Sequence, residues 1–337
     1  MIGFSEGFHD AAVAVVNDGK ICYATHSERY SKIKHDKHLD ITAASTAQLL
    51  CHDGKIAFYE RPWLKRTRQL FAGQKAWYRP RHLSLKPTQY YSHHKSHAAA
   101  AFQTSPFDEA AIVVVDSIGE WDTTSIWTAE YKDGKAVYKK RWSQWYPQSI
   151  GLWYSALTKW AGLRPLDEEY IFMGMAAFGN PVHMNVVEKQ LHKNNHKGAR
   201  IGDYDKCDIA KSAERILQLE LNNIFERASI YSKNICYGGG VALNCVVNTG
   251  LREMYNMWIM PCPGDAGGAL GAACLTYGGK VDFSPYLGYN IQKFCDPRRV
   301  VDALLEKRVV GVANGRAEFG PRALGNRSRL ADPRQAE

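Results

Sequence analysis

The sequence predicts a duplicated α/β fold whose two lobes face each other across a cleft. An apolar strand-like segment at residues 2–4, a polar turn, an apolar run from Ala11 to Val16 and an Asn-Asp-Gly turn open the chain. The same order returns about a hundred residues later, from the apolar run at 112–115 to the Lys-Asp-Gly turn at 132–134. Two such strand–turn–strand units are typical of a duplicated architecture.

Helical and glycine-rich segments follow the second unit. Apolar spacing predicts helices over residues 149–179 and 211–229, with a polar loop at 192–197 between them. A buried strand at 234–237 then leads directly into three glycines, and residues 261–271 repeat this order of strand end, turn and small-residue helix start. Glycines at a strand end let a ligand approach the backbone, so a nucleotide site is one interpretation and a plain tight turn is the other.

Length and composition indicate a globular chain. Its 337 residues are 45% hydrophobic, which is enough for a substantial core. The N-terminus does not resemble a signal peptide, and no apolar run approaches the roughly 20 residues that span a bilayer, so we expect a soluble cytoplasmic protein without a membrane partner. The eight cysteines form no CxxC pair, so we expect reduced, mostly structural thiols.

Three histidines, at positions 93, 94 and 97, precede a small-residue run that suits a helix. In a helix, His93 and His97 share one face, and two imidazoles at this spacing can bind one metal ion. Asp116 follows an apolar strand and Asp265 lies in an acidic turn, so their carboxylates are candidate ligands as well. This donor set suits iron, manganese or zinc better than calcium. Solvated histidines at a helix N-terminus are the alternative.

The chain carries a formal net charge of +9, and its basic residues cluster. Between Arg61 and Lys86 there are eight lysines and arginines and no acidic residue. Aromatic residues are interleaved among them: Trp63, Phe71, Trp77 and Tyr78. Basic groups can follow a phosphate backbone while rings stack on bases, which favours a nucleic-acid partner. A solvated basic surface with inward-packed rings is the other interpretation.

Several segments together resemble the O-carbamoyltransferases that modify antibiotics and nodulation factors, a family related to the tRNA threonylcarbamoyladenosine synthase. The resemblance covers nearly the whole chain, and its segments are residues 7–12, 27–36, 93–98, 105–107, 173–179, 239–244, 264–267 and 315–328. The last of these, GRAEFGPRALGNRS, is long and specific.

This resemblance implies an actin-like, sugar-kinase-like (ASKHA) fold with ATP and a divalent metal in a central cleft, with iron the first candidate and manganese or zinc the alternatives. Carbamoyl phosphate and ATP would give carbamoyl adenylate, and the carbamoyl group would then pass to an acceptor hydroxyl. The implied regions are a first lobe at 1–110 with the HxxxH pair, a second lobe at 111–300 with the glycine turns, and a remnant of a C-terminal carbamoyl-phosphate-binding region at 301–337.

The resemblance also implies roles for single residues. His93, His97, Asp116 and Asp265 would be the metal ligands, and His9 would be the general base that takes the proton of the attacking hydroxyl. The implied nucleotide- and phosphate-binding residues are Gly239, Gly240, Asn244, Gly267, Arg316, Arg322 and Arg327.

One departure from the family concerns the end of the chain. Family members usually continue with a second domain after the motif at 315–328, whereas this chain stops at Glu337. A minimal form, a partner chain that carries the domain and a truncated sequence are the three explanations, and the chain could associate as a homodimer.

The acceptor is a separate question. The basic segment favours DNA, with the hydroxymethyl group of a modified pyrimidine as the best candidate, and a base within a duplex would have to be flipped out first. The alternatives are a small-molecule acceptor, such as a sugar, nucleoside or antibiotic, and a nucleotide-binding subunit that needs a partner chain.

Overall fold

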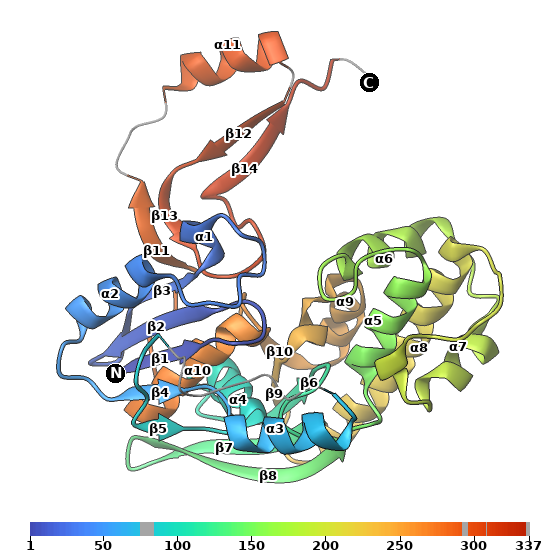
Figure 1. The fold of residues 1–337 in the computed structure, drawn as a ribbon, viewed down its shortest axis with the longest axis horizontal. Coiled ribbons are helices and arrows are strands. Elements are labelled where there is room, and N and C mark those ends of the chain that lie inside the picture. The colour runs from blue at the N-terminus through green and yellow to red at the C-terminus, as the bar shows by residue number, and fades with distance from the viewer. Residues whose placement is uncertain (75–83, 292–295, 308, 335–337) are drawn as a thin grey trace.

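Two five-stranded sheets form the centre of the computed structural model, which describes residues 1–74, 84–291, 296–307 and 309–334 (Figure 1). The first sheet has the order β3-β2-β1-β4-β5 and contains β1 (Ile2–Ser5), β2 (Ala12–Asn17), β3 (Lys20–His26), β4 (Ile56–Phe58) and β5 (Gln89–Tyr90). The second has the order β10-β9-β6-β7-β8 and contains β6 (Glu109–Val115), β7 (Asp122–Lys132), β8 (Lys135–Trp145), β9 (Asn234–Gly238) and β10 (Asn256–Ile259).

The two sheets have the same topology. In the first, β1 pairs antiparallel with β2 and parallel with β4; in the second, β6 pairs antiparallel with β7 and parallel with β9. Each unit therefore begins with a three-stranded meander and adds two parallel strands on the other side of its first strand. This repetition confirms the duplicated, two-lobed α/β class and both predicted strand–turn–strand units.

Two buried helices join the lobes. α4 (His93–Gln103) packs against β6 and β9, α10 (Asp265–Tyr277) packs against β1 and β2, and the two helices contact each other. Their close approach depends on Gly271, where a Cβ would lie 1.8 Å from the Ser96 carbonyl oxygen. The expected lobe boundaries at residues 110 and 300 remain a prediction, but α10 lies on the first sheet although it follows the second in the chain.

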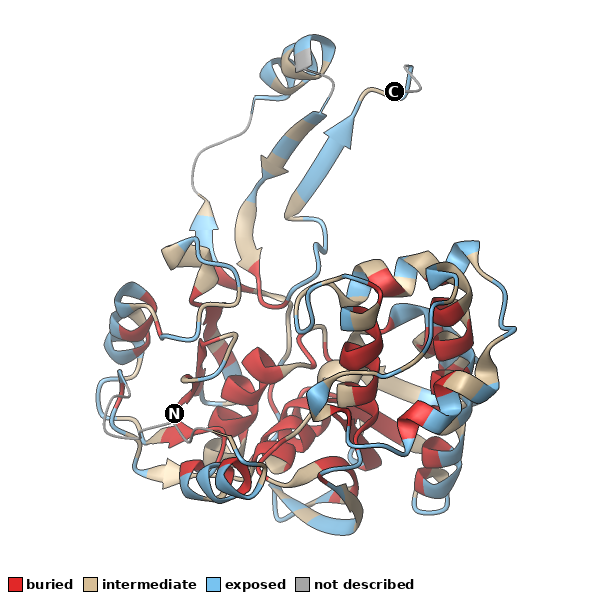
Figure 2. Ribbon diagram, turned by 45° about the vertical axis from the view of Figure 1, so that its right-hand side comes forward, coloured by how far each residue is buried: buried red, intermediate tan, exposed pale blue. Residues whose placement is uncertain are grey.

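The remaining helices cover the sheets. In the first lobe they are α1 (Glu28–Ser31), α2 (Ile41–Leu50) and α3 (Pro62–Phe71). In the second lobe they are α5 (Ile150–Trp160), α6 (Glu169–Met175), η2 (Ala176–Phe178), α7 (Met184–Leu191), η3 (Asn195–Lys197), α8 (Lys206–Ser229), η4 (Gly240–Leu243) and α9 (Cys245–Met254). Buried residues fill the sheets and the helix faces that pack on them (Figure 2).

Two helix predictions need correction. The segment 149–179 is not one helix, because Gly162 and Leu166 adopt left-handed backbone conformations with φ of 90° and 65° between α5 and α6. The helix predicted from residue 211 begins instead at Lys206, because the Asp205 side chain accepts hydrogen bonds from the backbone N–H groups of residues 207 and 208.

A C-terminal unit projects from the first lobe (Figure 1). It comprises β11 (Tyr286–Ile291), α11 (Pro297–Lys307), β12 (Val309–Ala313), β13 (Gly315–Glu318) and β14 (Arg327–Ala331), with β11 paired to β13 and β12 paired to β14. Its residues are mostly exposed or half-buried (Figure 2).

Across the described ranges, no helix combines the length and apolarity that crossing a bilayer requires. The seven described cysteines are free thiols, as expected.

Candidate functional site

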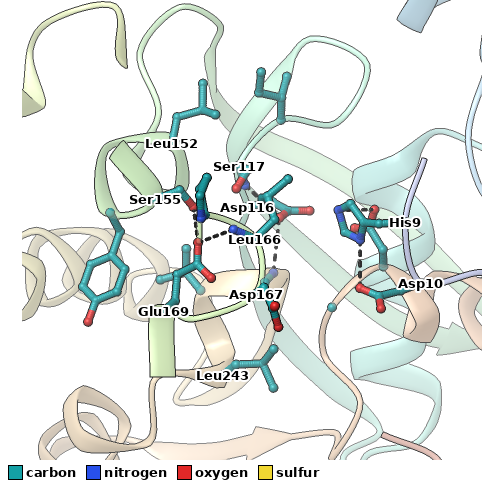
Figure 3. Close-up of a pocket in the computed structure, with 18 of the residues that line it drawn as sticks. His9, Asp10, Asp116, Ser117, Leu152, Ser155, Leu166, Asp167, Glu169 and Leu243 are labelled. Atoms are coloured by element: carbon teal, nitrogen blue, oxygen red, sulfur yellow. Dashed lines mark hydrogen bonds and ion pairs between the residues drawn. The ribbon is translucent and has the colours of Figure 1, made fainter. Parts of the chain in front are cut away.

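A cavity of about 850 Å³ lies between the two lobes (Figure 3). Its walls include His9 and Asp10 from the turn after β1, Asp116 and Ser117 from the turn after β6, and Asn244 before α9. The corresponding turns of the two duplicated units therefore meet at one place. This volume is in the range of small-molecule and cofactor sites.

Four predicted metal ligands converge beside this cavity, and two of them, Asp116 and Asp265, line it. The Nε2 atom of His93 lies 2.9 Å from Asp116 Oδ2 and 3.5 Å from Asp265 Oδ1. The Nε2 atom of His97 lies 3.3 Å from Asp116 Oδ2 and 3.6 Å from Asp265 Oδ1. Each residue offers a ligand atom within 4.8 Å of the other three, and all four residues are buried. The structure thus brings together residues from three separate elements.

Local structure aims each side chain inward. α4 begins at His93, so that residue and His97 lie one turn apart on the same face, as predicted. The Oδ1 atom of Asp116 accepts hydrogen bonds from the backbone N–H groups of Ser117 and Gly240, which leaves Oδ2 toward the histidines. Asp265 is the first residue of α10, where the helix dipole favours a carboxylate.

The electrostatics of the cluster suit a cation. Burial disfavours a charged imidazole, yet the carboxylates of Asp265 and Asp116 raise the pKa of His93 well above its ordinary value. The pKa of His97 is raised in the same way, again against the effect of burial. Two imidazole nitrogens and two carboxylates form a donor set that fits iron, manganese or zinc. A metal held by these four residues would act as a Lewis acid toward an oxygen of the substrate.

A further buried group supports His93. Glu60 Oε2 lies 3.6 Å from the His93 Nδ1 atom. Lys65 Nζ donates hydrogen bonds to both carboxylate oxygens of Glu60, at 2.9 Å to Oε1 and 3.0 Å to Oε2. The carboxylate of Glu120 accepts a hydrogen bond from the His93 backbone N–H. No sequence pattern indicates Glu60 or Glu120, because neither belongs to a recognisable motif.

His9, the predicted general base, lies in the same cavity (Figure 3). Its Nδ1 atom lies 2.8 Å from Asp10 Oδ2, and its Nε2 atom lies 3.6 Å from Asp265 Oδ2. Asp10 also contacts His35, with 2.8 Å between Oδ1 and Nδ1. Burial alone would raise the pKa of Asp10, but the hydrogen bonds with His35 and His9 lower it far below its usual value. An ionised Asp10 only accepts, so it holds the proton of His9 on Nδ1 and leaves Nε2 as the basic atom.

Three of the predicted nucleotide-binding residues follow β9. Gly239 has φ of 90°, and a Cβ there would lie 2.2 Å from the Val115 carbonyl oxygen, so this glycine is required by the backbone. Gly240 and Asn244 line the cavity, and the Asn244 side chain caps α9. Gly267 lies within α10 against the Cys262 carbonyl group; among the described residues it is not itself part of the cavity lining, although Cys262 and Ala266 are.

The three predicted phosphate-binding arginines lie in different places. Arg322 lines the cavity and donates a hydrogen bond to the Leu243 carbonyl oxygen at 2.9 Å. Arg316 donates to carbonyl oxygens of β11 and β3, and Arg327 donates to three carbonyl oxygens of the 320–322 loop. Phosphate binding by these arginines stays a prediction. In the described part of the chain, Arg322 is the one of the three at the cavity.

The basic segment is divided between surface and interior. Arg61, Arg66 and Lys86 are exposed, whereas Lys65 and Arg68 are buried and line the cavity. The predicted partner-binding residues Lys75, Trp77, Tyr78, Arg79 and Arg81 lie outside the described residues. The sequence alone could not separate the exposed basic residues from the buried ones, because the exposed Arg66 lies between the buried Lys65 and Arg68 on the same helix, α3.

Comparison with known proteins identifies relatives over almost the whole chain. A protein of Synechocystis sp., Uncharacterized protein sll1178, is 30% identical over 99% of this chain and 71% of its own length. Nodulation protein NolNO of Sinorhizobium fredii is 26% identical over 97% of this chain, which spans 59% of that protein. The 3′-hydroxymethylcephem-O-carbamoyltransferase of Amycolatopsis lactamdurans is 26% identical over 99% of this chain and 73% of its own length.

Two family models match as well. The model described as Carbamoyltransferase N-terminus matches residues 58–211 and 196–274, and the model described as Carbamoyltransferase C-terminus matches residues 301–337. These matches cover well over half of the chain and agree with the resemblance and the enzyme class predicted from its motifs. The chain therefore belongs to the carbamoyltransferase family.

Proposed function

We propose that this protein is an O-carbamoyltransferase that moves a carbamoyl group from carbamoyl phosphate, with ATP, to an acceptor hydroxyl. The observation that carries the proposal is the placement of His9 beside the four converging side chains of His93, His97, Asp116 and Asp265, two of which, Asp116 and Asp265, line the same cavity as His9. Asp265 connects the two, since one of its oxygens faces the histidine cluster and the other faces His9 Nε2.

Each part of the cavity has a proposed role. The four converging residues would hold a divalent metal, with Fe²⁺ the first candidate and Mn²⁺ or Zn²⁺ the alternatives, and the metal would polarise an oxygen of the activated substrate. Gly240 and Asn244 would flank the nucleotide. His9 would accept the proton of the acceptor hydroxyl on Nε2, because Asp10 keeps the other ring nitrogen protonated. General-base catalysis of this kind contributes roughly 10²- to 10⁴-fold.

A small-molecule hydroxyl is the acceptor that we propose first. It is supported by the activity for which the cephem relative is named and by the burial of Lys65 and Arg68, which line the cavity rather than an exposed surface. A hydroxymethylated pyrimidine in DNA is the second candidate. It is supported by α3, where the exposed Arg61 and Arg66 flank Trp63, whose exposed fraction is 52%.

The test is mass spectrometry of acceptors after incubation with the protein, ATP, carbamoyl phosphate and ferrous iron. The panel should contain hydroxymethylcytosine and hydroxymethyluracil, each as free nucleoside and within DNA, together with sugars and hydroxymethyl antibiotics. A mass gain of one carbamoyl group that disappears in His9→Ala, while ATP binding persists in that variant, is the expected result. If ATP binds but no acceptor is modified and carbamoyl phosphate stimulates no ATP turnover, the protein is better described as a nucleotide-binding subunit that needs a partner.

A further inference from the structure

Part of the cavity wall is formed by two buried cations of α3. Lys65 and Arg68 are only 4% and 5% exposed, and both line the cavity together with the neighbouring Gln69. They lie one helical turn apart, so their side chains leave the same face of α3. This face is distinct from the one that exposes Trp63 and Arg66.

The two cations differ in their partners. Lys65 forms an ion pair with Glu60. Arg68 donates from Nε to the Glu120 carbonyl oxygen at 3.1 Å, and its Nη1 atom lies 3.5 Å from Gln74 Oε1. Among the described residues, no carboxylate lies within ion-pair distance of the Arg68 guanidinium. A buried charge without a counter-charge is costly, and a ligand that supplies one would remove this cost.

Gln69 gives an independent indication of a ligand at this place. Its side chain is 4% exposed and lines the cavity, and its Oε1 atom has no hydrogen-bond partner in the described chain. Buried polar atoms of this kind normally have a partner. An amide can present either its oxygen or its NH₂ group to a bound molecule, so Gln69 can donate beside the guanidinium.

Four further acidic residues that line the cavity already have ion-pair or hydrogen-bond partners. Asp10 contacts two histidines, Glu28 contacts Arg29, and Asp167 contacts Lys34 and His35. Glu169 accepts hydrogen bonds from the Ser155 hydroxyl and the Leu166 backbone N–H (Figure 3). Of the buried lysines and arginines that line the cavity within the described chain, Arg68 is therefore the one whose charge no carboxylate balances.

We propose that Arg68, with Gln69, binds an oxyanion carried by the acceptor, either a carboxylate or a phosphoryl group. A guanidinium can bind both kinds of oxyanion through two parallel hydrogen bonds. Gly240 and Asn244, the residues expected to hold the nucleotide, belong to the second lobe, whereas α3 belongs to the first. We therefore assign the oxyanion bound at α3 to the acceptor and not to the nucleotide. This inference rests on the proposed transfer to a hydroxyl and adds that the hydroxyl belongs to an anionic molecule.

The first experiment measures anion binding without turnover. Inorganic phosphate and acetate are titrated calorimetrically into the full chain saturated with ATP, which occupies the nucleotide site. We expect Arg68→Gln to weaken binding of the preferred anion by about tenfold or more, because a charged hydrogen-bonded contact is lost, while Arg68→Lys loses less. Arg66→Gln is the matched control, since Arg66 is exposed on the same helix. Unchanged binding by Arg68→Gln, or an equal loss in Arg66→Gln, overturns the proposal.

A second measurement does not depend on a variant that folds. In the wild-type chain, phosphate or acetate should slow amide hydrogen exchange in α3, and exchange in α3 that neither anion changes also overturns the proposal. The preferred anion distinguishes a phosphoryl group from a carboxylate. Both measurements can succeed when no carbamoyl transfer is seen, so failure of the proposed function is recognised separately.

Steady-state kinetics then tests the source of the anion. For an acceptor supplied both as 5-hydroxymethyl-2′-deoxycytidine and as its 5′-monophosphate, Arg68→Gln should raise the KM of the monophosphate and leave that of the nucleoside unchanged. For a carboxylated acceptor, Arg68→Gln should likewise raise the KM of the free carboxylate and leave the KM of its methyl ester unchanged. A raised KM for carbamoyl phosphate alone would instead assign Arg68 to the carbamoyl donor and overturn the acceptor assignment.

Discussion

The Nε2 atoms of His93 and His97 lie 3.0 Å apart on successive turns of α4, and both face Asp116. Neutral imidazoles in this arrangement direct nitrogen lone pairs toward the same point, and the carboxylate of Asp265 approaches that point from α10. Such convergence needs a positive charge between the four groups, supplied by protons or by a metal ion. Metal titration of a variant that lacks one of the four groups separates these two cases.

Replacing His97 with alanine should weaken metal binding, because one of four ligands is removed from a buried site. The loss should exceed the roughly 10- to 100-fold that follows from changing a residue that only supports a ligand. Titration of the apo protein with Fe²⁺, Mn²⁺ and Zn²⁺ measures it. His94→Gln is the control, because His94 lies on the same helix but its Nδ1 atom faces the Ser125 hydroxyl at 2.7 Å. Equal metal affinity in wild type and His97→Ala would contradict the site.

Glu60 should tune the same site through His93. Glu60→Gln removes the carboxylate near Nδ1 of that ligand, so we expect metal affinity to fall about 10- to 100-fold. It also takes the counter-charge from the buried Lys65, which should lower the free energy of unfolding by about 3–5 kcal/mol. The two effects are measured by metal titration and by urea denaturation.

The double variant Glu60→Gln with Lys65→Met distinguishes positioning from stability. Removing both members of a buried ion pair is often close to neutral for folding, so the double variant should recover most of the stability lost in the single one. Its metal affinity should stay low, because the carboxylate near His93 is still absent. Recovery of metal affinity together with stability would show that Glu60 acts only through folding.

Sequence patterns predicted the centre of this molecule well because they report on backbone geometry. The HxxxH spacing placed His93 and His97 on one face of a helix. The repeated strand–turn–strand units placed Asp116 in the second unit's turn, which corresponds to the turn that carries Asp10 in the first unit. Resemblance to known motifs added His9, which the structure places in the same cavity. These features depend on residues that are close in the sequence or that belong to specific motifs.

Contacts between distant segments could not be predicted in the same way. Nothing local to Glu60 or Lys65 indicates that they form a buried pair behind His93, because that pair depends on how α3 packs against α4. Phosphate binding by Arg316 and Arg327 stays a prediction, and the sequence did not indicate that Arg316 donates to backbone carbonyl oxygens of β3 and β11 or that Arg327 donates to those of the 320–322 loop. Leu166, which lies between α5 and α6, adopts a left-handed backbone conformation, and a leucine in the sequence does not indicate such a conformation.

His35 should make stability depend on pH. Its hydrogen bond with Asp10 raises its pKa to about 9, against the effect of burial, from an ordinary value of 6.5. Since the folded state holds the proton more tightly, the stabilisation is fully present below pH 6.5 and is lost as the pH rises through about 9. Urea denaturation between pH 6 and 9.5 should show this decline in wild type and less of it in His35→Gln. His52→Gln is the control, because His52 is exposed. If the free energy of unfolding of His35→Gln changed with pH in parallel with that of wild type, the result would argue against this role of His35.

Gly239 should be intolerant of any side chain. It combines φ of 90° with a position where a Cβ would lie 2.2 Å from the Val115 carbonyl oxygen, so Gly239→Ala has to displace the start of the turn that carries Gly240. The strained backbone alone costs about 1–3 kcal/mol, and the displacement should also weaken nucleotide binding, because Gly240 lines the cavity. Gly174→Ala is the matched control, since it lies in α6 with no atom within 4 Å of the added carbon, and alanine favours a helix. Urea denaturation and ATP titration of both variants make the comparison, and equal stability and affinity in the two would show that the turn after β9 does not require a glycine.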